Sequence, residues 1–267
     1  MTLIGIDIGG STTKIIGLDG DNMMRPLKVM AADPITSVYG AFGRYITENK
    51  IDLSSISQIK ITGVGSTHIN NKIYNIDTVH VDEFKAIGLG GLHLSGLDKA
   101  IIVSMGTGTA FVYADKNVIY HMGGTGVGGG TLCGLSSRFL DVNNFENIVE
   151  LATDGNLSNV DLTVGDISVT DSYMPSKVTA ANFGKISDYA SKSDIALGFI
   201  NMVFQTVGMM AVFASRSKET KDIVLCGNLA SIPCARELIS IIEDLHDVKF
   251  HILENADYAT ALGAAVG

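Results

Sequence analysis

The chain has no tryptophan, four prolines and three cysteines in 267 residues, and 19 lysines and arginines against 28 aspartates and glutamates. The resulting net charge of −9 argues against a general nucleic-acid binder, because a phosphate backbone needs a basic surface. Cys133, Cys226 and Cys234 fit neither a disulfide framework nor a zinc spacing, and the six histidines are scattered without ligand spacing. We therefore expect buried, reduced thiols and no nucleic-acid partner.

The first residues, "MTLIGIDIGG", contain neither a basic region nor a small-residue cleavage site, so we expect a cytoplasmic protein without a secretion signal. Residues Ile195 to Ser215 carry no charge and are numerous enough to span a bilayer. Asn201 and Gln205 dilute this stretch, and aromatic or basic anchors are sparse around it. A helix that is apolar all round also suits a protein core or a subunit interface. We expect a buried helix and no membrane partner.

Hydrophobic residues make up 46% and charged residues 18% of the chain, which is typical of a globular protein. Apolar strand patterns alternate with helical ones, which predicts an α/β fold. A strand, a glycine-rich turn and hairpin strands occur at 3–18 and again at 100–121, which indicates an internal duplication. We predict two similar lobes, residues 1–95 and 96–267, with a cleft between them. The polar segment 155–178 is expected to run over the surface.

Four glycine-rich turns follow apolar strands: "GIDIGGSTTK" (5–14), "MGTGT" (105–109), "GGTGVGGGT" (123–131) and "LCGN" (225–228). Glycine lets a backbone approach a ligand closely, and converging N–H groups bind phosphate oxygens. The third turn leads into a helical pattern over 131–140, whose N-terminus would favour an anion. We predict a phosphate-binding cleft, although any one of these turns alone also fits a tight hairpin.

Residues 124–129 match G-x-G-x-x-G, the pattern of dinucleotide-binding folds. That fold needs a further β-strand after the helix, whereas two helical patterns, ending at Ala152, follow one another here. A Walker-type Gly-Lys-Ser/Thr ending is also absent from the sequence. The match therefore carries little weight.

Asp7 lies in the middle of an apolar strand, where a carboxylate is costly to desolvate unless it binds a cation or a donor. The glycines and hydroxyl residues from Gly9 to Thr13 follow it, so Asp7 fits a metal-anchoring acid beside a phosphate loop. Lys14 would reach a phosphate undergoing transfer. The alternative is a surface hairpin with Asp7 at an exposed strand end.

This opening, Asp-x-Gly-Gly-Ser-Thr, is similar to the first phosphate loop of the acetate and sugar kinase, Hsp70 and actin superfamily. Within that superfamily the chain resembles the type II pantothenate kinases over nearly its whole length. The segments that carry the resemblance are "GIDIGGSTTK" (5–14), "VDEFKAIGLG" (81–90), "GTGT" (106–109), "GGTGVGGGTLCGL" (123–135), "NVDLTVGDI" (159–167), "TAANFG" (179–184) and "ALGAAVG" (261–267). The middle glycine segment and "TAANFG" are the most specific of these.

The resemblance implies two actin-like (ribonuclease H-like) lobes, a homodimer, and transfer of phosphate from Mg-ATP to pantothenate, the first step of coenzyme A biosynthesis. Glu83 matches the general base of the family, whereas the residues alone would let Asp82 and Glu83 simply stabilise a helix start. Asp7 would order Mg²⁺. The nucleotide and phosphate residues would be Ile6, Asp7, Ile8, Gly9, Gly10, Ser11, Thr12, Thr13, Lys14, Thr107, Gly128, Gly129, Gly130, Thr131, Leu132, Cys133, Gly134, Phe145, Gly227 and Asn228.

The acceptor-binding residues implied by the resemblance are Glu83, Ser104, Gly106, Thr107, His121, Thr179 and Ala180. In the family, the segment that matches Thr179 to Phe183 comes from the partner subunit and closes the pocket. The long apolar helix would then belong to the dimer interface.

Two positions depart from the family pattern. His121 stands where the family usually has an arginine that pairs the pantothenate carboxylate, and Ala110 stands where a serine often touches the substrate. A neutral imidazole holds a carboxylate less firmly than a guanidinium does. Kinase activity is therefore better supported than pantothenate specificity, and another acceptor, an amino sugar or a hydroxy acid, remains an alternative.

A second alternative is an ATPase switch resembling the activators of 2-hydroxyacyl-CoA dehydratases, which share similar opening motifs. Those proteins bridge an iron–sulfur cluster with cysteines at a dimer interface. Cys133 falls inside the presumed nucleotide loop and Cys226 at a strand end, so the sequence offers no matching ligand set.

Overall fold

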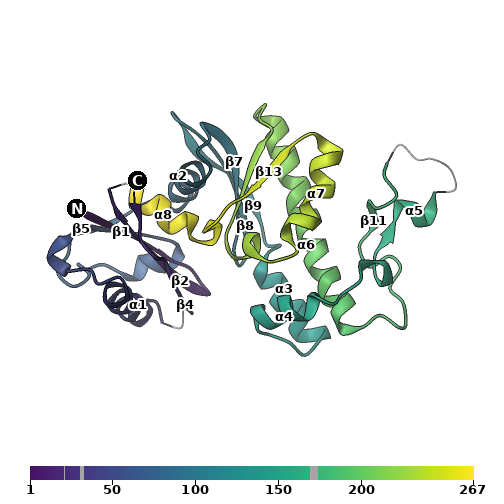
Figure 1. Cartoon of the computed structure of the whole chain (residues 1–267), viewed down its shortest axis with the longest axis horizontal. Helices are drawn as coiled ribbons and strands as arrows, with labels where there is room; N and C mark the ends of the chain where they lie inside the picture. The colour runs from purple at the N-terminus through teal and green to yellow at the C-terminus, as the bar shows by residue number, and fades with distance from the viewer. Residues whose placement is uncertain (21, 31–32, 169–173) are drawn as a thin grey trace.

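The computed structural model describes residues 1–20, 22–30, 33–168 and 174–267. Two mixed β-sheets stand side by side, with helices between them and on their outer faces, and a small two-stranded sheet extends from one end (Figure 1). The predicted α/β fold with two lobes is confirmed.

The first sheet has the strand order β3-β2-β1-β5-β6, with β4 also paired to β2. β1 runs antiparallel to β2 and parallel to β5, so the glycine-rich turn after β1 lies at one end of the sheet. The strands are β1 (Thr2–Ile8), β2 (Thr12–Asp19), β3 (Asn22–Met23), β4 (Leu27–Met30), β5 (Ile56–Thr62) and β6 (Thr78–His80).

The second sheet has the order β13-β12-β7-β8-β9 and repeats this plan, with an antiparallel meander on one side of its first strand and parallel strands on the other. The predicted duplication is thus visible in the topology. Its strands are β7 (Lys99–Met105), β8 (Thr109–Asp115), β9 (Ile119–Thr125), β12 (Asp222–Cys226) and β13 (Lys249–Ile252), and the small separate sheet pairs β10 (Leu162–Thr163) with β11 (Thr179–Ala181).

The helices bury the faces of both sheets. α1, whose first turn is capped by the Asp33 carboxylate accepting from the Thr36 N–H at 2.7 Å, covers the outer face of the first sheet. α6 and α7 cover the far face of the second sheet, with α3 and α4 beside them (Figure 1). The helices are α1 (Pro34–Glu48), α2 (Glu83–Ser95), α3 (Gly129–Phe139), α4 (Phe145–Ala152), α5 (Val164–Ile167), α6 (Lys192–Ser217), α7 (Ala235–His246) and α8 (Ala259–Val266).

α2 and α8 cross between the two sheets and connect the lobes (Figure 1). Their backbones meet at glycine: a Cβ on Gly90 would lie 1.8 Å from the carbonyl oxygen of Ala259, and one on Gly263 would lie 1.7 Å from that of Ala86. α8 also packs against β1 through Gly5. The C-terminal helix therefore rests on the first sheet, although its residues fall in the predicted second range, 96–267.

α6 is the predicted apolar helix. By length and composition it could cross a membrane, but 61% of its most apolar window is buried inside the protein. One face of α6, which includes Phe204, packs into the core of the second lobe. The opposite face, with Phe213, is exposed. The expectation of a buried helix therefore holds for one face.

Two local predictions need correction. β9 runs on to Thr125 and α3 begins at Gly129, so the third glycine-rich turn is much shorter than 123–131. The cysteines are free as expected, but Cys226 alone among the three is fully buried. Segment 155–178 contains the short elements β10 and α5, and its residues 169–173 lie outside the described residues.

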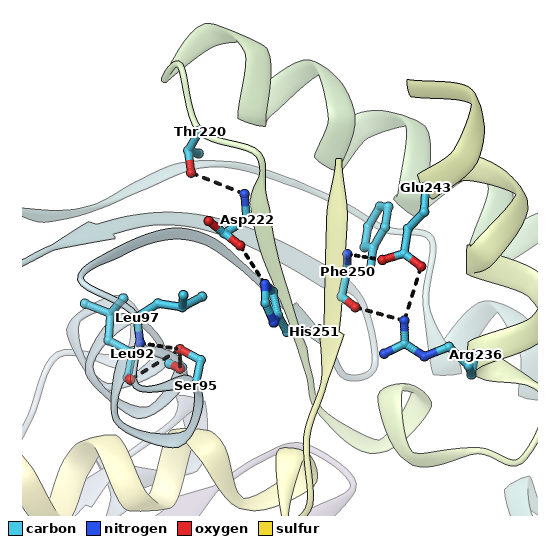
Figure 2. Close-up of polar contacts among 10 residues, drawn as sticks. Leu92, Ser95, Leu97, Thr220, Asp222, Arg236, Glu243, Phe250 and His251 are labelled. Carbon is cyan, nitrogen blue, oxygen red and sulfur yellow. Dashed lines mark hydrogen bonds and ion pairs between the residues drawn. The ribbon is translucent and has the colours of Figure 1, made fainter. Parts of the chain in front are cut away.

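Away from the glycine turns, the edge of the second sheet is fixed by side chains that bond to neighbouring strands and helices (Figure 2). His251 on β13 bonds Asp222 on β12 at 2.7 Å, and Arg236 and Glu243 of α7 bond the backbone of Phe250. The hydroxyl of Ser95 donates to a carbonyl of its own helix, α2. The bonds of His251, Arg236 and Glu243 hold β12, β13 and α7 together.

Candidate active site

A cavity of about 660 Å³ lies where the glycine-rich turns of both sheets converge on α2 and α3. It is the cleft that the sequence predicts. The predicted site residues that line it are Asp7, Gly9, Gly10, Ser11, Thr12, Lys14, Glu83, Ser104, Gly106, Thr107, His121, Gly129, Gly130, Cys133, Phe145, Gly227 and Asn228.

Other predicted residues lie outside the cavity lining. Ile6, Ile8 and Leu132 pack in the apolar cores, so the structure does not place their side chains at the predicted ATP site. Thr179 and Ala180 lie on β11, beyond α6 (Figure 1), and neither residue lines the cavity of the same chain. The remaining residues, which are buried beneath the lining or flank it, are Thr13, Gly128, Thr131 and Gly134.

The phosphate loops of the two lobes touch each other. The Ser11 hydroxyl, after β1, lies 3.1 Å from the hydroxyl of Thr107, after β7. The main chain closes the first loop, because the Gly9 N–H donates to the Thr12 carbonyl at 3.0 Å. Two hydroxyl-bearing loops therefore face the same point from opposite sheets, which suits a phosphate group held between lobes.

The glycine run at 123–130 serves mainly to pack loop against loop. The N–H groups of Gly129 and Gly130 donate to the carbonyls of Gly106 and Thr107, each at 2.8 Å. A Cβ on Gly128 would lie 2.7 Å from the Thr107 carbonyl oxygen. The prediction that the α3 N-terminus is open to an anion is therefore wrong for these two N–H groups. Glycine is required here because two backbones nearly touch.

Asp7 is partly buried near the end of β1, opposite Lys14 on β2 and Thr62 on β5. Burial raises the pKa of Asp7 above its ordinary value, and the Lys14 ammonium partly offsets that rise. Burial in turn lowers the pKa of Lys14, against the effect of Asp7. Within the described part of the chain, the buried Thr62 hydroxyl has no hydrogen-bond partner. A carboxylate beside an unpaired hydroxyl offers hard oxygen donors to a cation.

Asp82 and Glu83 have separate roles at the start of α2. The Asp82 carboxylate accepts from the Lys85 N–H at 2.8 Å and caps the helix. Glu83 is half-buried and turns into the cavity. Burial raises the pKa of Glu83 above its ordinary value, and the nearby carboxylates of Asp7 and Asp82 raise it further. A carboxylate so placed is suited to accept a proton near neutral pH.

His121 lines the cavity beside Glu83 because β9 bulges. Phe111 pairs with Gly123 but Val112 pairs with His121, so Met122 is an extra residue that shifts the side-chain alternation. Such bulges redirect side chains next to functional sites. The His121 ring stacks on Phe84 of α2, with centroids 3.9 Å apart and planes at 15°. Ala110 lines the same part of the cavity.

Sequence reasoning missed three lining residues that bear on chemistry: Phe84, Lys28 and Glu146. Phe84 directly follows Glu83, so its position in the motif was the available signal. Lys28 lies on a four-residue strand whose pairing with β2 brings it opposite Lys14, a relation that its sequence position does not reveal. At the opposite side of the cavity, the buried Oδ1 of Asn228 accepts no hydrogen bond from the described residues.

The fold defines the class of protein. The whole chain superposes on component A of the (R)-2-hydroxyglutaryl-CoA dehydratase of Acidaminococcus fermentans, with a TM-score of 0.70 at 18% identity and 96% of that chain covered. It likewise superposes on a ROK family glucokinase from Streptomyces griseus, with a TM-score of 0.66 at 12% identity and 98% of that chain covered. The molecule therefore has the two-lobed, actin-like fold.

The sequence gives the family. A model of the Fumble family matches residues 99–266. Curated relatives named type II pantothenate kinase include one from Staphylococcus haemolyticus, 28% identical over 98% of both chains, and one from Bacillus anthracis, 30% identical over 84% of this chain and 82% of the relative. The chain belongs to the Fumble family, together with these type II pantothenate kinases. The resemblance that the motifs indicate is confirmed.

Proposed function

We propose that this protein transfers the γ-phosphoryl group of ATP to the primary hydroxyl of pantothenate, giving 4′-phosphopantothenate. The observation that carries the proposal is the position of Glu83. Its half-buried carboxylate, with a raised pKa, lies in one cavity with two hydroxyl-rich loops from opposite lobes. Family membership supports the same reaction.

The reaction follows from these positions. The acceptor hydroxyl is oriented beside Glu83, which takes its proton as the oxygen attacks the γ-phosphorus. The new O–P bond forms while the bond from phosphorus to the bridging oxygen breaks, and ADP leaves. Ser11 and Thr107 hold the transferring group between the lobes, and the charge of Lys14 opposes the rise in the Asp7 pKa that burial causes. Positioning and charge neutralisation supply most of the catalysis in such transfers.

Mg²⁺ fits the oxygen donors present. Among the described residues no group of three His, Cys, Asp or Glu side chains is arranged to hold a metal. Mg²⁺ commonly binds through one or two carboxylates together with substrate phosphates and waters. Asp7, with the unpaired Thr62 hydroxyl beside it, is the residue to hold the ion. When bound, the ion neutralises phosphate charge.

A homodimer in the cytoplasm completes the proposal. Met202, Thr206, Met209 and Phe213 follow one another along α6 at intervals of four, three and four residues, the spacing of a helix–helix seam. Thr206 and Phe213 are exposed, and Met202 and Met209 are partly exposed. Phe213 is 61% exposed. Thr179 cannot reach the cavity of its own chain, and the family pattern assigns its segment to the site of the partner subunit. Pairing through α6 would bring β11 toward a second molecule.

The test of the proposed function is ADP release across a panel of pantothenate, pantetheine, amino sugars and other hydroxy acids. We expect Mg-dependent turnover with pantothenate, at a kcat/KM well above that of any amino sugar. Release of ADP at one rate whatever the acceptor would contradict the proposal and favour an ATPase switch. Such a switch holds its cluster with cysteines at a dimer interface, whereas Cys226 is 1% exposed and Cys133 lines the cavity.

His121→Arg is expected to increase the preference of the enzyme for an acceptor that carries a carboxylate. A guanidinium can still stack on Phe84 and adds a fixed positive charge, and a hydrogen bond to a charged group contributes about 1.5–3 kcal/mol. We expect the ratio of kcat/KM for pantothenate over pantetheine, its uncharged analogue, to rise about tenfold or more. The control is His121→Gln, which adds no charge. An unchanged ratio in His121→Arg would mean that residue 121 does not face the carboxylate.

A further inference from the structure

The cavity lining carries more carboxylates than lysines, although a triphosphate needs positive charge to bind. The carboxylates of Asp7, Glu83 and Glu146 face it, and within the described residues the lysines in its lining are Lys14 and Lys28. The triphosphate of ATP is a polyanion, so its binding needs cationic groups that remain free to donate.

Lys14 is poorly placed to serve as such a group. Its residue is only 6% exposed and lies opposite Asp7 in the β1–β2 pairing. Burial lowers the pKa of Lys14, and the charges of Asp7 and Asp257 oppose that effect. A buried ammonium beside Asp7 has little freedom to move toward a ligand.

Lys28 differs from Lys14 in its exposure to the cavity and to solvent. It lies directly opposite Lys14 in the β2–β4 pairing and lines the cavity next to the first phosphate loop. Its side chain is 37% exposed. Its Nζ lies 3.7 Å from Oδ2 of Asp257, whose side chain is only 15% exposed. That separation is long for an ion pair, so the ammonium is held near the loop without being fully engaged.

We propose that Lys28 is a phosphate-binding residue, whose ammonium contacts the β- or γ-phosphate of the nucleotide, and that Asp257 holds it ready when the cavity is empty. The inference rests on the proposed function in one respect, that the ligand is a nucleoside triphosphate. On binding, the ammonium exchanges its long contact with Asp257 for phosphate oxygens, while Lys14 stays with Asp7.

The test is a series of binding measurements on the full chain by calorimetry, with a non-hydrolysable ATP analogue, ADP, AMP and adenosine at fixed Mg²⁺. Lys28→Met is expected to weaken binding of the ATP analogue about tenfold or more, and to leave adenosine binding within twofold of wild type. Lys28→Arg is expected to retain most of the affinity. The matched control is Lys72→Met, which removes a lysine paired with Asp77 at 3.5 Å on the same lobe.

Asp257→Asn separates a phosphate contact from a structural ion pair. If Lys28 serves only to hold Asp257, both variants should lose affinity equally along the whole series, and the proposal is overturned. We expect instead that Asp257→Asn binds the ATP analogue as well as wild type, because Lys28 keeps its charge. The proposal would also be overturned if Lys28→Met lost affinity for adenosine and for the ATP analogue by the same factor.

The outcomes also distinguish this inference from the proposed function. If the wild-type protein phosphorylates pantothenate but Lys28→Met binds every nucleotide of the series as wild type does, the role of Lys28 is refuted and the proposed function stands. Wild-type protein that binds none of the adenine nucleotides would refute both.

Discussion

Replacement of Glu83 by glutamine is expected to lower kcat by about 10²–10⁴-fold, the usual contribution of a positioned general base. Glutamine keeps the size and hydrogen-bonding capacity of the side chain but cannot take a proton from the acceptor hydroxyl. Affinity for the ATP analogue should stay near that of wild type. Because burial and two neighbouring carboxylates raise the pKa of Glu83, its charge costs stability, so the variant should melt at the same temperature or higher.

The dependence of kcat/KM on pH is a second test of Glu83 as the general base. The base must be ionised, so kcat/KM should fall as the pH drops through the pKa of Glu83, at a pH above the ordinary glutamate value of 4.5. Asp82→Asn is the matched control. Asparagine caps a helix about as well as aspartate, but the substitution removes one of the charges that raise the pKa of Glu83. The acidic limb should therefore move to lower pH while kcat at neutral pH is kept. An Asp82→Asn profile that coincides with wild type would show that another group controls the limb.

Local patterns predicted much of this architecture. The apolar strands and the position of Asp7 in one of them follow from residues close in sequence. Asp7 could be singled out because a carboxylate in such a strand needs a partner. The structure places Lys14, seven residues later across a hairpin, opposite Asp7 in the strand pairing.

The features that sequence reasoning missed come from contacts between distant segments. Ser11 and Thr107 are 96 residues apart and meet because two lobes face each other. The Phe84–His121 stack depends on an extra residue in β9, and a one-residue shift turns a side chain to the other face of a sheet. The N–H groups of Gly129 and Gly130 looked available to a ligand, yet the neighbouring loop already accepts from them.

The glycine contact between α2 and α8 is where a small change should affect stability most. Gly90→Ala places a methyl group where the Ala259 carbonyl oxygen lies 1.8 Å away and its carbon 2.6 Å away. Backbone atoms cannot swing aside as a flexible side chain can, so the two helices must separate, and overpacking in a core costs about 3 kcal/mol in its severe cases. We expect the melting temperature to fall by about 10 °C, as measured by calorimetry.

Gly40→Ala is the control, because it is expected to raise the stability that Gly90→Ala lowers. Gly40 lies within α1, and a Cβ there meets nothing within 4 Å. Alanine inside a helix is favoured over glycine by roughly 0.5–1 kcal/mol, so this variant should be slightly more stable than wild type. A Gly90→Ala protein that gains stability as Gly40→Ala does would mean that α2 and α8 can separate at no cost.

The double variant Gly90→Ala with Gly263→Ala tests whether the two glycines act as one contact. A Cβ on Gly263 would lie 2.6 Å from the Gly90 nitrogen, and one on Gly90 would lie 3.1 Å from the Gly263 nitrogen. Once the first methyl group has separated the helices, the second meets a wider gap, so the combined loss of stability should be smaller than the sum of the single losses. Because α2 also carries Glu83 at its first residue, the same separation should lower kcat, whereas Gly40→Ala should leave it unchanged.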